Sequence, residues 1–242
     1  MKIIFNTIAG VGKEESDDRV LVGKKVYKET YQECELNRGF VAVADGVGGN
    51  SWAAAAAAFV CEQCASLDQP TSEDFQKINA LLVEKNQDKR ATTFSGLFFH
   101  GTDLTLFQVG NTRIYQLLGG KYLKQLTHDD TVVQQLLDTH KLTEEESHNY
   151  TGRNEITACF GGGSEKYLKL QEKELTPTSG NSWILTSDGI HEYVSIDEME
   201  DVLSQNRDDG GRAVQRITEL ALQHGSQDDC SIVLIIPDAK EE

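Results

Sequence analysis

The feature of the sequence that most restricts its fold is an apolar run that stops at an Asp-Gly pair. Residues 39–44, GFVAVA, are almost continuously apolar, which predicts a buried strand. Asp45 and Gly46 follow at once, and the glycine allows a sharp turn. The six alanines at 53–58 then predict a helix with a small-residue face, which can pack very close to a sheet. The segment therefore predicts a strand and a helix in tight contact, with a carboxylate at the turn between them.

Strand signals follow one another in the middle of the chain. Short apolar runs separated by Gly-containing turns predict antiparallel strands at 94–100, 104–109, 113–118 and 121–126. A helix is predicted at 131–137, and an apolar stripe between 214 and 224 predicts another. Because the helices do not alternate strictly with the strands, the pattern favours an α+β fold with helices layered on antiparallel sheets over a doubly wound parallel fold.

The bulk composition restricts the domain organisation and the partners. With 242 residues and only 3 prolines, the chain shows no linker, so we expect one domain over residues 1–242 with a loose tail at about 238–242. The formal net charge of −16 argues against nucleic-acid binding, which needs a Lys/Arg footprint. Solubility is the simple explanation of this negative charge. A more specific explanation is that some of the carboxylates converge to bind cations.

Several segments bear on the cellular compartment. The apolar stretch near the N-terminus is too short for a targeting signal. No run approaches the ~20 apolar residues of a membrane span, so we expect no membrane partner. Five cysteines, an odd number, fit a reducing cytoplasm better than a disulfide framework. Cys61 and Cys64 form a C-x-x-C within the alanine-rich helix, where a packed helix face is favoured over a redox or zinc site.

Acidic residues meet predicted strands at three places. Asp45 and Asp188 stand at strand ends and are each followed by Gly, and Asp228 stands at a strand start. An isolated Asp-Gly pair is most often a simple turn. Carboxylates that meet at one end of a sandwich would repel one another unless a cation lay between them. Oxygen-only ligands favour Mg²⁺ or Mn²⁺ over zinc, so the combination predicts a site for these cations.

Six motifs, in order along nearly the whole chain, resemble those of the metal-dependent protein phosphatases of the PPM, or type 2C, family in its compact bacterial form. VADGVGG at 43–49, VGNTRIY at 109–115 and LTHDDT at 126–131 are similar to the family's ADGMGG, VGDSRxY and LTxDHS. RNEITA at 153–158, LTSDGI at 185–190 and DDCSIV at 228–233 are similar to RNxLTRA, LxSDGL and DNITVV. The resemblance implies a four-layer α-β-β-α sandwich with a central antiparallel β-sandwich and the metal site at one end.

The resemblance also implies roles for individual residues. Two Mn²⁺ or Mg²⁺ ions would share Asp45, with Asp188 and Asp228 completing the coordination of one ion. The Gly46 carbonyl would bind the other ion, which Asp17 would reach, usually through water. Water activated by the two cations would attack phosphorus directly, without a phospho-enzyme.

Catalytic roles beside the metals are implied for two further residues. Asp18 falls where the family has an Asp that orients the attacking water. Lys13 falls where the family commonly has Arg, so we expect it to contact the phosphate as a point charge. A solvated surface lysine is the alternative. Residues 138–160 are expected to form a polar flap over the cleft, suited to recognising a protein substrate.

Several positions depart from the family pattern. Asp17 is one methylene shorter than the family Glu, and Val47 cannot donate a proton to the leaving group. Asn111 replaces an Asp that helps to hold a third metal in bacterial relatives, so third-metal binding is expected to be weak or absent. Asp130 replaces a His, and Asp229 replaces an Asn; a turn role is favoured over a ligand role for Asp229.

The resemblance implies hydrolysis of phosphoserine and phosphothreonine in proteins, and we expect the protein to act as a cytoplasmic monomer. The same resemblance implies that it would oppose a bacterial Ser/Thr kinase. Two alternatives are a regulatory binding module with weak or no catalysis and a phosphatase for small phosphate esters. The three aspartates favour an enzyme, because a scaffold has no need of convergent carboxylates.

Overall fold

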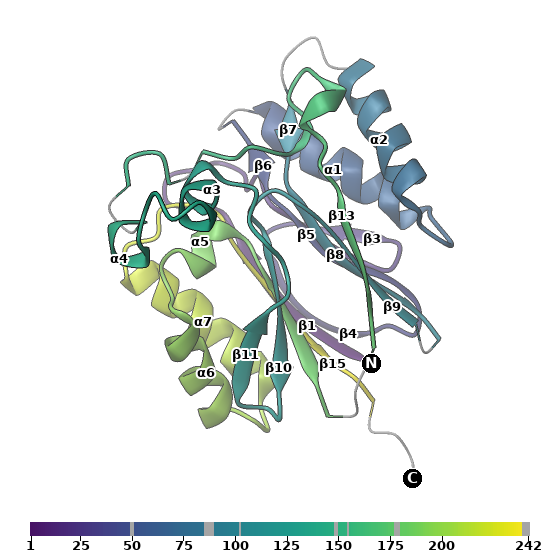
Figure 1. Ribbon diagram of the computed structural model, residues 1–242. Coiled ribbons are helices and arrows are strands. Elements are labelled where there is room, and N and C mark those ends of the chain that lie inside the picture. Colours follow the sequence, from purple (N-terminus) through teal and green to yellow (C-terminus); the bar gives the residue numbers. More distant parts are fainter. Residues whose placement is uncertain are drawn as a thin grey trace.

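Two six-stranded antiparallel sheets pack face to face at the centre of the molecule, with helices on both outer faces (Figure 1). The structure is a computed structural model that describes residues 1–48, 51–84, 90–101, 103–147, 150–153, 155–176 and 180–238. The predicted α+β fold with a four-layer α-β-β-α sandwich is confirmed.

In both six-stranded sheets, neighbouring strands run antiparallel. The first sheet has the order β11 (Tyr122–Gln125), β10 (Arg113–Leu118), β14 (Ser182–Thr186), β15 (Cys230–Ile236), β1 (Lys2–Ile8) and β4 (Thr30–Glu35). The second sheet has the order β13 (Gln171–Leu175), β9 (Asp103–Val109), β8 (Phe94–His100), β5 (Gly39–Ala44), β2 (Arg19–Val22) and β3 (Lys25–Tyr27). Three two-residue strands form a small third sheet: β12 (Phe160–Gly161), β7 (Ala91–Thr92) and β6 (Gly46–Val47).

The helices divide between the two outer faces and one end of the sandwich (Figure 1). The second sheet is covered by α1 (Ser51–Ala65) and α2 (Ser72–Glu84). The first sheet is covered by α5 (Asp188–His191), α6 (Ile196–Gln205) and α7 (Gly210–Gln223). Two short helices, α3 (Val132–Asp138) and α4 (Glu144–Ser147), lie near one end, and a 3₁₀ turn spans Glu165–Tyr167.

Strand β5 shows why its sequence is apolar without alternation. Val41 and Val43 face the core between the two sheets, whereas Ala42 and Ala44 face the core under α1. A strand buried on both faces needs apolar side chains at every position. The predicted buried strand at 39–44 is therefore confirmed, and its end is held rigidly between two cores.

Helix α1 presses its small side chains against the strands, as its alanines predict. Ala53, Ala56 and Ala57 are fully buried, and Cys61 and Cys64 lie in the same core. Burial raises the pKa of the Cys61 thiol to about 12 and also raises that of Cys64. Both thiols are therefore protonated and enclosed, as expected of a packed helix face and not of a redox site.

Several strands of the structure were not assigned from sequence. β4 and β13 lie at the edges of their sheets, where one face and one side meet solvent. β13 reads QEKEL, which has almost no apolar signal, yet it pairs along its length with β9. Such a strand forms because its backbone hydrogen-bonds to a neighbouring strand, and this pairing leaves no pattern in the local sequence. Residues 239–242 of the predicted tail lie outside the described residues, and none of the described helices has the length and apolar character needed to cross a membrane.

An aromatic cluster around Phe75 fixes α2 to the second sheet. The ring centroid of Phe75 lies 4.6 Å from that of Phe107, 5.8 Å from that of Phe94 and 6.1 Å from that of Phe160. Phe75 is fully buried. Phe75 therefore fills the junction between the helix and three strands.

We expect Phe75→Ala to lower the free energy of unfolding by about 3–5 kcal/mol, because it removes a buried ring and leaves a cavity. Urea unfolding of the two proteins measures the difference. Leu81→Ala on the same helix is the matched control, since Leu81 is 41% exposed, and it should change the midpoint little. Equal losses for both variants would contradict the packing role of Phe75.

Candidate metal centre

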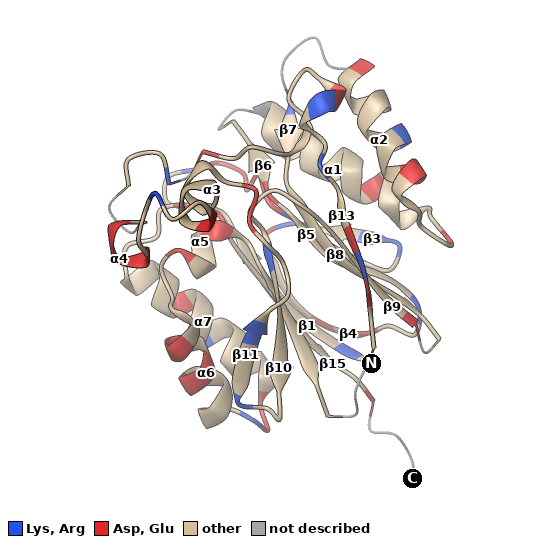
Figure 2. Cartoon of the chain, viewed as in Figure 1, with Lys and Arg blue, Asp and Glu red and all other residues tan. Residues whose placement is uncertain are grey.

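A polar cavity of about 330 Å³ opens at one end of the sandwich. Its lining contains the four carboxylates that the sequence predicts as ligands, and acidic segments gather at this end in Figure 2. The lining residues are Lys13, Asp17, Asp45, Gly46, Val47, Gly48, Asn111, Ile156, Asp188 and Asp228. Residues that are far apart in the sequence are thus brought together as predicted; only Asp18, among the predicted site residues, lies outside the lining.

The ends of strands place the three central aspartates. Asp45 follows β5, Asp188 opens α5 after the end of β14, and Asp228 lies two residues before β15. The Asp45 carbonyl accepts hydrogen bonds from the Thr93 N–H at 2.8 Å and the Thr92 hydroxyl at 2.8 Å. The backbone that carries Asp45 is therefore held by two adjacent residues at the junction of β7 and β8.

The two glycines that follow Asp45 and Asp188 are required by crowding. A Cβ at Gly46 would lie 2.5 Å from the Ala53 carbonyl of α1, and a Cβ at Gly189 would lie 2.0 Å from the Asp229 carbonyl oxygen. Real Cβ atoms do not approach backbone so closely. Each Asp-Gly pair thus permits a neighbouring segment to pack against the residue that carries the carboxylate.

The carboxylates raise one another's pKa. Removal from water raises the pKa of Asp45 well above its ordinary value, and the charges of Asp188, Asp18 and Asp228 add to the effect. Burial also raises the pKa of Asp188, as does Asp228, while the Asn111 amide opposes the shift. The carboxyl groups of Asp45 and Asp188 are close enough to hydrogen-bond to each other. Such a set is stabilised by positive charge placed among its members.

Asp18 lies behind the cavity and is fully buried. Neither of its carboxylate oxygens makes a hydrogen bond of ordinary geometry. Burial raises its pKa to about 8, nearby hydroxyls of Ser231 and Ser187 lower it, and the charges of Asp229 and Asp188 raise it. A buried carboxylate without a full set of partners is costly, so this group is suited to accept a hydrogen bond from a bound water or ligand.

Lys13 places its ammonium group among the carboxylates. Its Nζ lies 2.9 Å from Asp228 Oδ1, 2.9 Å from Asp229 Oδ2 and 3.5 Å from Asp17 Oδ2. Partial burial lowers the pKa of Lys13, but the hydrogen bonds to Asp229 and Asp228 outweigh this and raise it. Lys13 is therefore a fixed positive charge on the cavity wall, and its contact with phosphate remains a prediction.

Asp229 supports the site from outside the cavity. Asp229 is buried, and its carboxylate accepts hydrogen bonds from the Gly10 N–H, the Asp17 N–H and the Lys13 ammonium. The sequence favoured a turn role and gave no sign of these partners, because Gly10 lies 219 residues away. Only the acidic doublet at 228–229 could have drawn attention to it.

The donor set fits hard divalent cations, because every carboxylate and carbonyl of the lining offers oxygen. Within the part of the chain that the structure describes, no three Asp, Glu, His or Cys side chains surround a single point closely enough to enclose an ion. Asp228 Oδ1 accepts a hydrogen bond from the Lys13 ammonium, and Asn111 Nδ2 donates a hydrogen bond to Asp188 Oδ2 at 3.0 Å. The ligands are therefore assembled at one cavity but not closed around an ion. The expected weakness of a third metal at Asn111 remains a prediction.

A second cavity of about 540 Å³ adjoins the first and shares Asn111 with it. Its two arginines are held by carboxylates: Arg113 forms a bidentate pair with Asp129, and Arg153 Nη2 lies 2.7 Å from Glu192. These pairs fix two arginines of the cavity wall. The predicted flap at 138–160 borders this cavity through α4 and Arg153; its residues 148, 149 and 154 lie outside the described ranges.

Other polar residues near the site have structural partners. His191 is buried, its Nδ1 lies 2.8 Å from Thr186 Oγ1, and burial lowers its pKa well below the ordinary value. Val47 lines the cavity and offers no proton. Asp130 accepts a hydrogen bond from the Gly110 N–H at 3.0 Å, away from the cavity lining.

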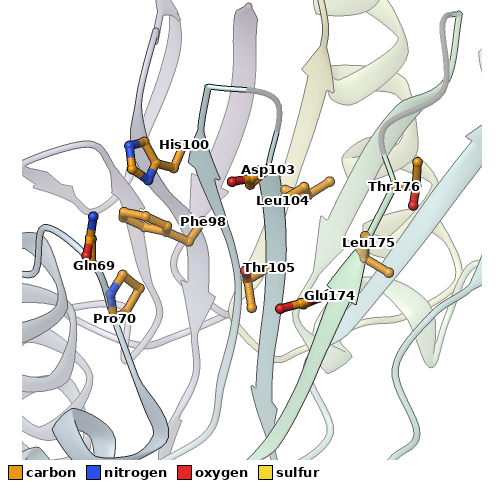
Figure 3. A pocket seen from close by; sticks show the side chains of 10 residues that line it. All are labelled: Gln69, Pro70, Phe98, His100, Asp103, Leu104, Thr105, Glu174, Leu175 and Thr176. Atoms are coloured by element: carbon orange, nitrogen blue, oxygen red, sulfur yellow. The ribbon is translucent and has the colours of Figure 1, made fainter.

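A third cavity, of about 800 Å³, is remote from these carboxylates. It lies on the outer face of the second sheet, beside the far ends of β8 and β9 and the edge strand β13 (Figure 3). Its lining contains none of the residues of the candidate metal centre. Its size alone therefore does not make it the reactive site.

Comparisons with known proteins find related sequences and similar folds, although no family model matches the chain. The chain is 30% identical over 232 residues to the serine/threonine protein phosphatase PstP of Mycobacterium tuberculosis, covering 90% of this chain and 43% of PstP. It is 25% identical over 224 residues to the serine/threonine phosphatase stp of Listeria monocytogenes, covering 85% of this chain and 87% of stp. The chain thus spans less than half the length of PstP but most of stp.

Solved structures share the fold. The crystal structure of the M. tuberculosis serine/threonine phosphatase PstP/Ppp superposes with a TM-score of 0.81 at 23% identity, covering 100% of both chains. The PstP catalytic domain in complex with two manganese ions superposes with a TM-score of 0.76 at 24% identity, covering 97% of this chain and 98% of that chain. The chain has the fold of the bacterial PPM-type serine/threonine phosphatases. The resemblance of its sequence to that family is confirmed by the named relatives.

We expect Asp45→Asn to stabilise the metal-free protein at neutral pH. The folded-state pKa of Asp45 is raised above its ordinary value, so the carboxyl group favours folding at low pH and this contribution is lost as the pH rises through the folded-state pKa. In a chelator, the variant should melt at least about 2–4 °C higher than wild type near pH 7.5 and almost equally near pH 4.

Thermal unfolding followed by circular dichroism across this pH range makes the measurement. Asp208→Asn, at an exposed position, removes the same charge and should leave the curve unchanged. A lower melting temperature for Asp45→Asn at neutral pH would show that the carboxylate stabilises the empty fold.

Proposed function

We propose that this protein is a metal-dependent phosphatase that hydrolyses phosphoserine and phosphothreonine in proteins. The observation that carries the proposal is the convergence of Asp17, Asp45, Asp188 and Asp228 on one cavity beside a fixed ammonium group. Oxygen ligands for two cations and a positive charge for a phosphate are the elements that phosphoryl transfer to water needs. The names of PstP and stp support the same activity.

The proposal includes two Mn²⁺ or Mg²⁺ ions. Asp45 would be shared between them, Asp188 and Asp228 would complete the coordination of one, and the Gly46 carbonyl with Asp17 would serve the other. The all-oxygen lining supports this assignment, and so does the binding of two manganese ions by the PstP catalytic domain. When bound, the cations would supply charge for the phosphoryl group and lower the pKa of the attacking water.

The chain's own residues would divide the remaining work. Asp18 is buried with unsatisfied oxygens, so it would accept a hydrogen bond from the attacking water and orient it. Lys13 would hold a phosphate oxygen through its ammonium group, which already lies at the cavity wall. Val47 offers no proton, so the leaving group would take its proton from solvent.

Two alternatives have less support. A regulatory module without catalysis would not need carboxylates such as Asp45 and Asp188, whose pKa values are raised by burial and by neighbouring carboxylates. A phosphatase for small phosphate esters would use the same metal centre, and comparison of phosphopeptides with small phosphate esters separates it from a protein phosphatase. The proposal further includes a bacterial Ser/Thr kinase as opponent, no nucleic-acid partner, and action as a cytoplasmic monomer.

We expect hydrolysis of p-nitrophenyl phosphate that depends on Mn²⁺ and that Asp228→Asn reduces at least about 100-fold, because the variant removes a ligand charge. Initial rates with Mn²⁺ and with chelator make the measurement. The matched control is Asp208→Asn at an exposed position, which should keep the wild-type rate. Turnover that persists in chelator, or that survives Asp228→Asn, would contradict the proposed function.

We expect Lys13→Met to raise the KM for p-nitrophenyl phosphate about tenfold, because a charge-assisted contact to the phosphate is lost while the length of the side chain is kept. Steady-state kinetics at saturating Mn²⁺ gives both constants. Lys24→Met, in the exposed turn between β2 and β3, is the matched control. Unchanged KM and kcat in Lys13→Met would remove Lys13 from the site.

A further inference from the structure

Asp229 joins three points of the loop at residues 9–18, which leads from β1 to β2 along one side of the cavity. Its Oδ1 accepts a hydrogen bond from the Gly10 N–H at 2.7 Å. Its Oδ2 accepts from the Asp17 N–H at 2.7 Å and from Lys13 Nζ at 2.9 Å. One buried carboxylate therefore satisfies two backbone donors and one side-chain cation of the same loop.

The backbone around Asp229 is itself tightly held. The Val11 N–H donates to the Gln227 carbonyl at 3.0 Å, which fixes the loop to the segment before β15. On its other side, the Asp229 carbonyl accepts a hydrogen bond from the Ser187 hydroxyl at 3.3 Å and crowds Gly189. Asp229 thus has a fixed position between the loop and the segment that carries Asp188, and it can transmit that position to Lys13.

The three carboxylates around Lys13 differ in what else they would do. Asp17 and Asp228 line the cavity and are proposed metal ligands, and the Asp228 side chain is 52% exposed. The Asp229 side chain is 3% exposed and does not line the cavity. Its contact with Lys13 is therefore the one that can persist when the other two carboxylates turn toward cations.

A lysine side chain needs such an anchor to act at a defined place. It has four rotatable methylene bonds and a strongly hydrated ammonium group, so an unanchored lysine loses considerable entropy when it binds a ligand. We propose that Asp229 is a positioning residue. It holds the Lys13 ammonium and the loop at residues 9–18 in the position in which they would bind a phosphate group. This inference rests on the proposed function and assigns Asp229 no direct contact with metal or substrate.

The test is a double-mutant cycle with Asp229→Asn and Lys13→Met, measured with p-nitrophenyl phosphate at saturating Mn²⁺. Asp229→Asn keeps the shape of the side chain but removes its charge and one acceptor. We expect it to raise KM about five- to tenfold in the wild-type background, with a smaller change in kcat, and to add less than about twofold when Lys13 is already Met. Equal effects in both backgrounds, or no effect in either, would overturn the positioning role.

A second measurement does not depend on catalysis. Hydrogen exchange of the metal-free protein should show that Asp229→Asn speeds exchange of the Gly10 and Asp17 amides about tenfold or more, because their acceptor is weakened. Lys13→Met and the control Asp208→Asn should leave both amides protected. Unchanged protection in Asp229→Asn would overturn the inference even if the enzyme is active. If wild type shows no phosphatase activity, the proposed function fails, and the exchange result still decides whether Asp229 holds the loop.

Two further measurements separate the role of Asp229 from those of a ligand and a folding residue. Calorimetry should show that Asp229→Asn binds Mn²⁺ within about threefold of wild type, whereas Asp228→Asn loses affinity at least about tenfold. An equal loss in both variants would make Asp229 a ligand. If Asp229→Asn does not fold, Asp229→Glu keeps the charge but displaces it by one methylene, and it should raise KM about fivefold; a wild-type KM in Asp229→Glu would overturn the inference.

Discussion

Repulsion between carboxylates dominates the end of the sandwich where the cavity lies. The charges of Asp188 and Asp228 raise the pKa of the buried Asp45 carboxyl, and the Lys13 ammonium, which is hydrogen-bonded to Asp228, offsets only part of this repulsion. The three aspartates stay together because β5, β14 and β15 are fixed by burial on both faces and by antiparallel pairing. The stability of the two sheets therefore supports a site that opposes folding when it is empty of cations.

Close packing determines how this support reaches the ligands. Gly46 lets α1 approach the turn that carries Asp45, and Gly189 lets the segment before β15 approach the start of α5. In both places a missing side chain allows two backbones to meet, so the carboxylate next to it has little freedom. The same close packing explains the alanines of α1, whose small side chains leave room for the turn that carries Asp45.

Residues with a local signal could be predicted, and residues that act through distant partners could not. Asp45 and Asp188 follow apolar strands and precede Gly, so the residues next to them predict that they stand at strand ends. The edge strand β13 has no such pattern, because its pairing with β9 is made by backbone groups. Asp229 was expected to serve a turn, since its contacts with Gly10 and Lys13 cross more than two hundred residues. The hydrogen bond between Lys13 and Asp228 likewise has no signal in the sequence.

The pairing of β1 with β15 has a consequence for the order in which the protein is made. The first strand pairs with β4 on one side, but its partner on the other side, Cys230–Ile236, is synthesised more than two hundred residues later, and Asp228 and Asp229 come just before that partner. Until then the loop that carries Lys13 lacks its anchor, and the carboxylate of Asp228 is missing from the neighbourhood of Asp45. A ribosome-bound chain is therefore without a complete centre until residues 228–236 have been synthesised, and the centre then forms in one step of long-range pairing.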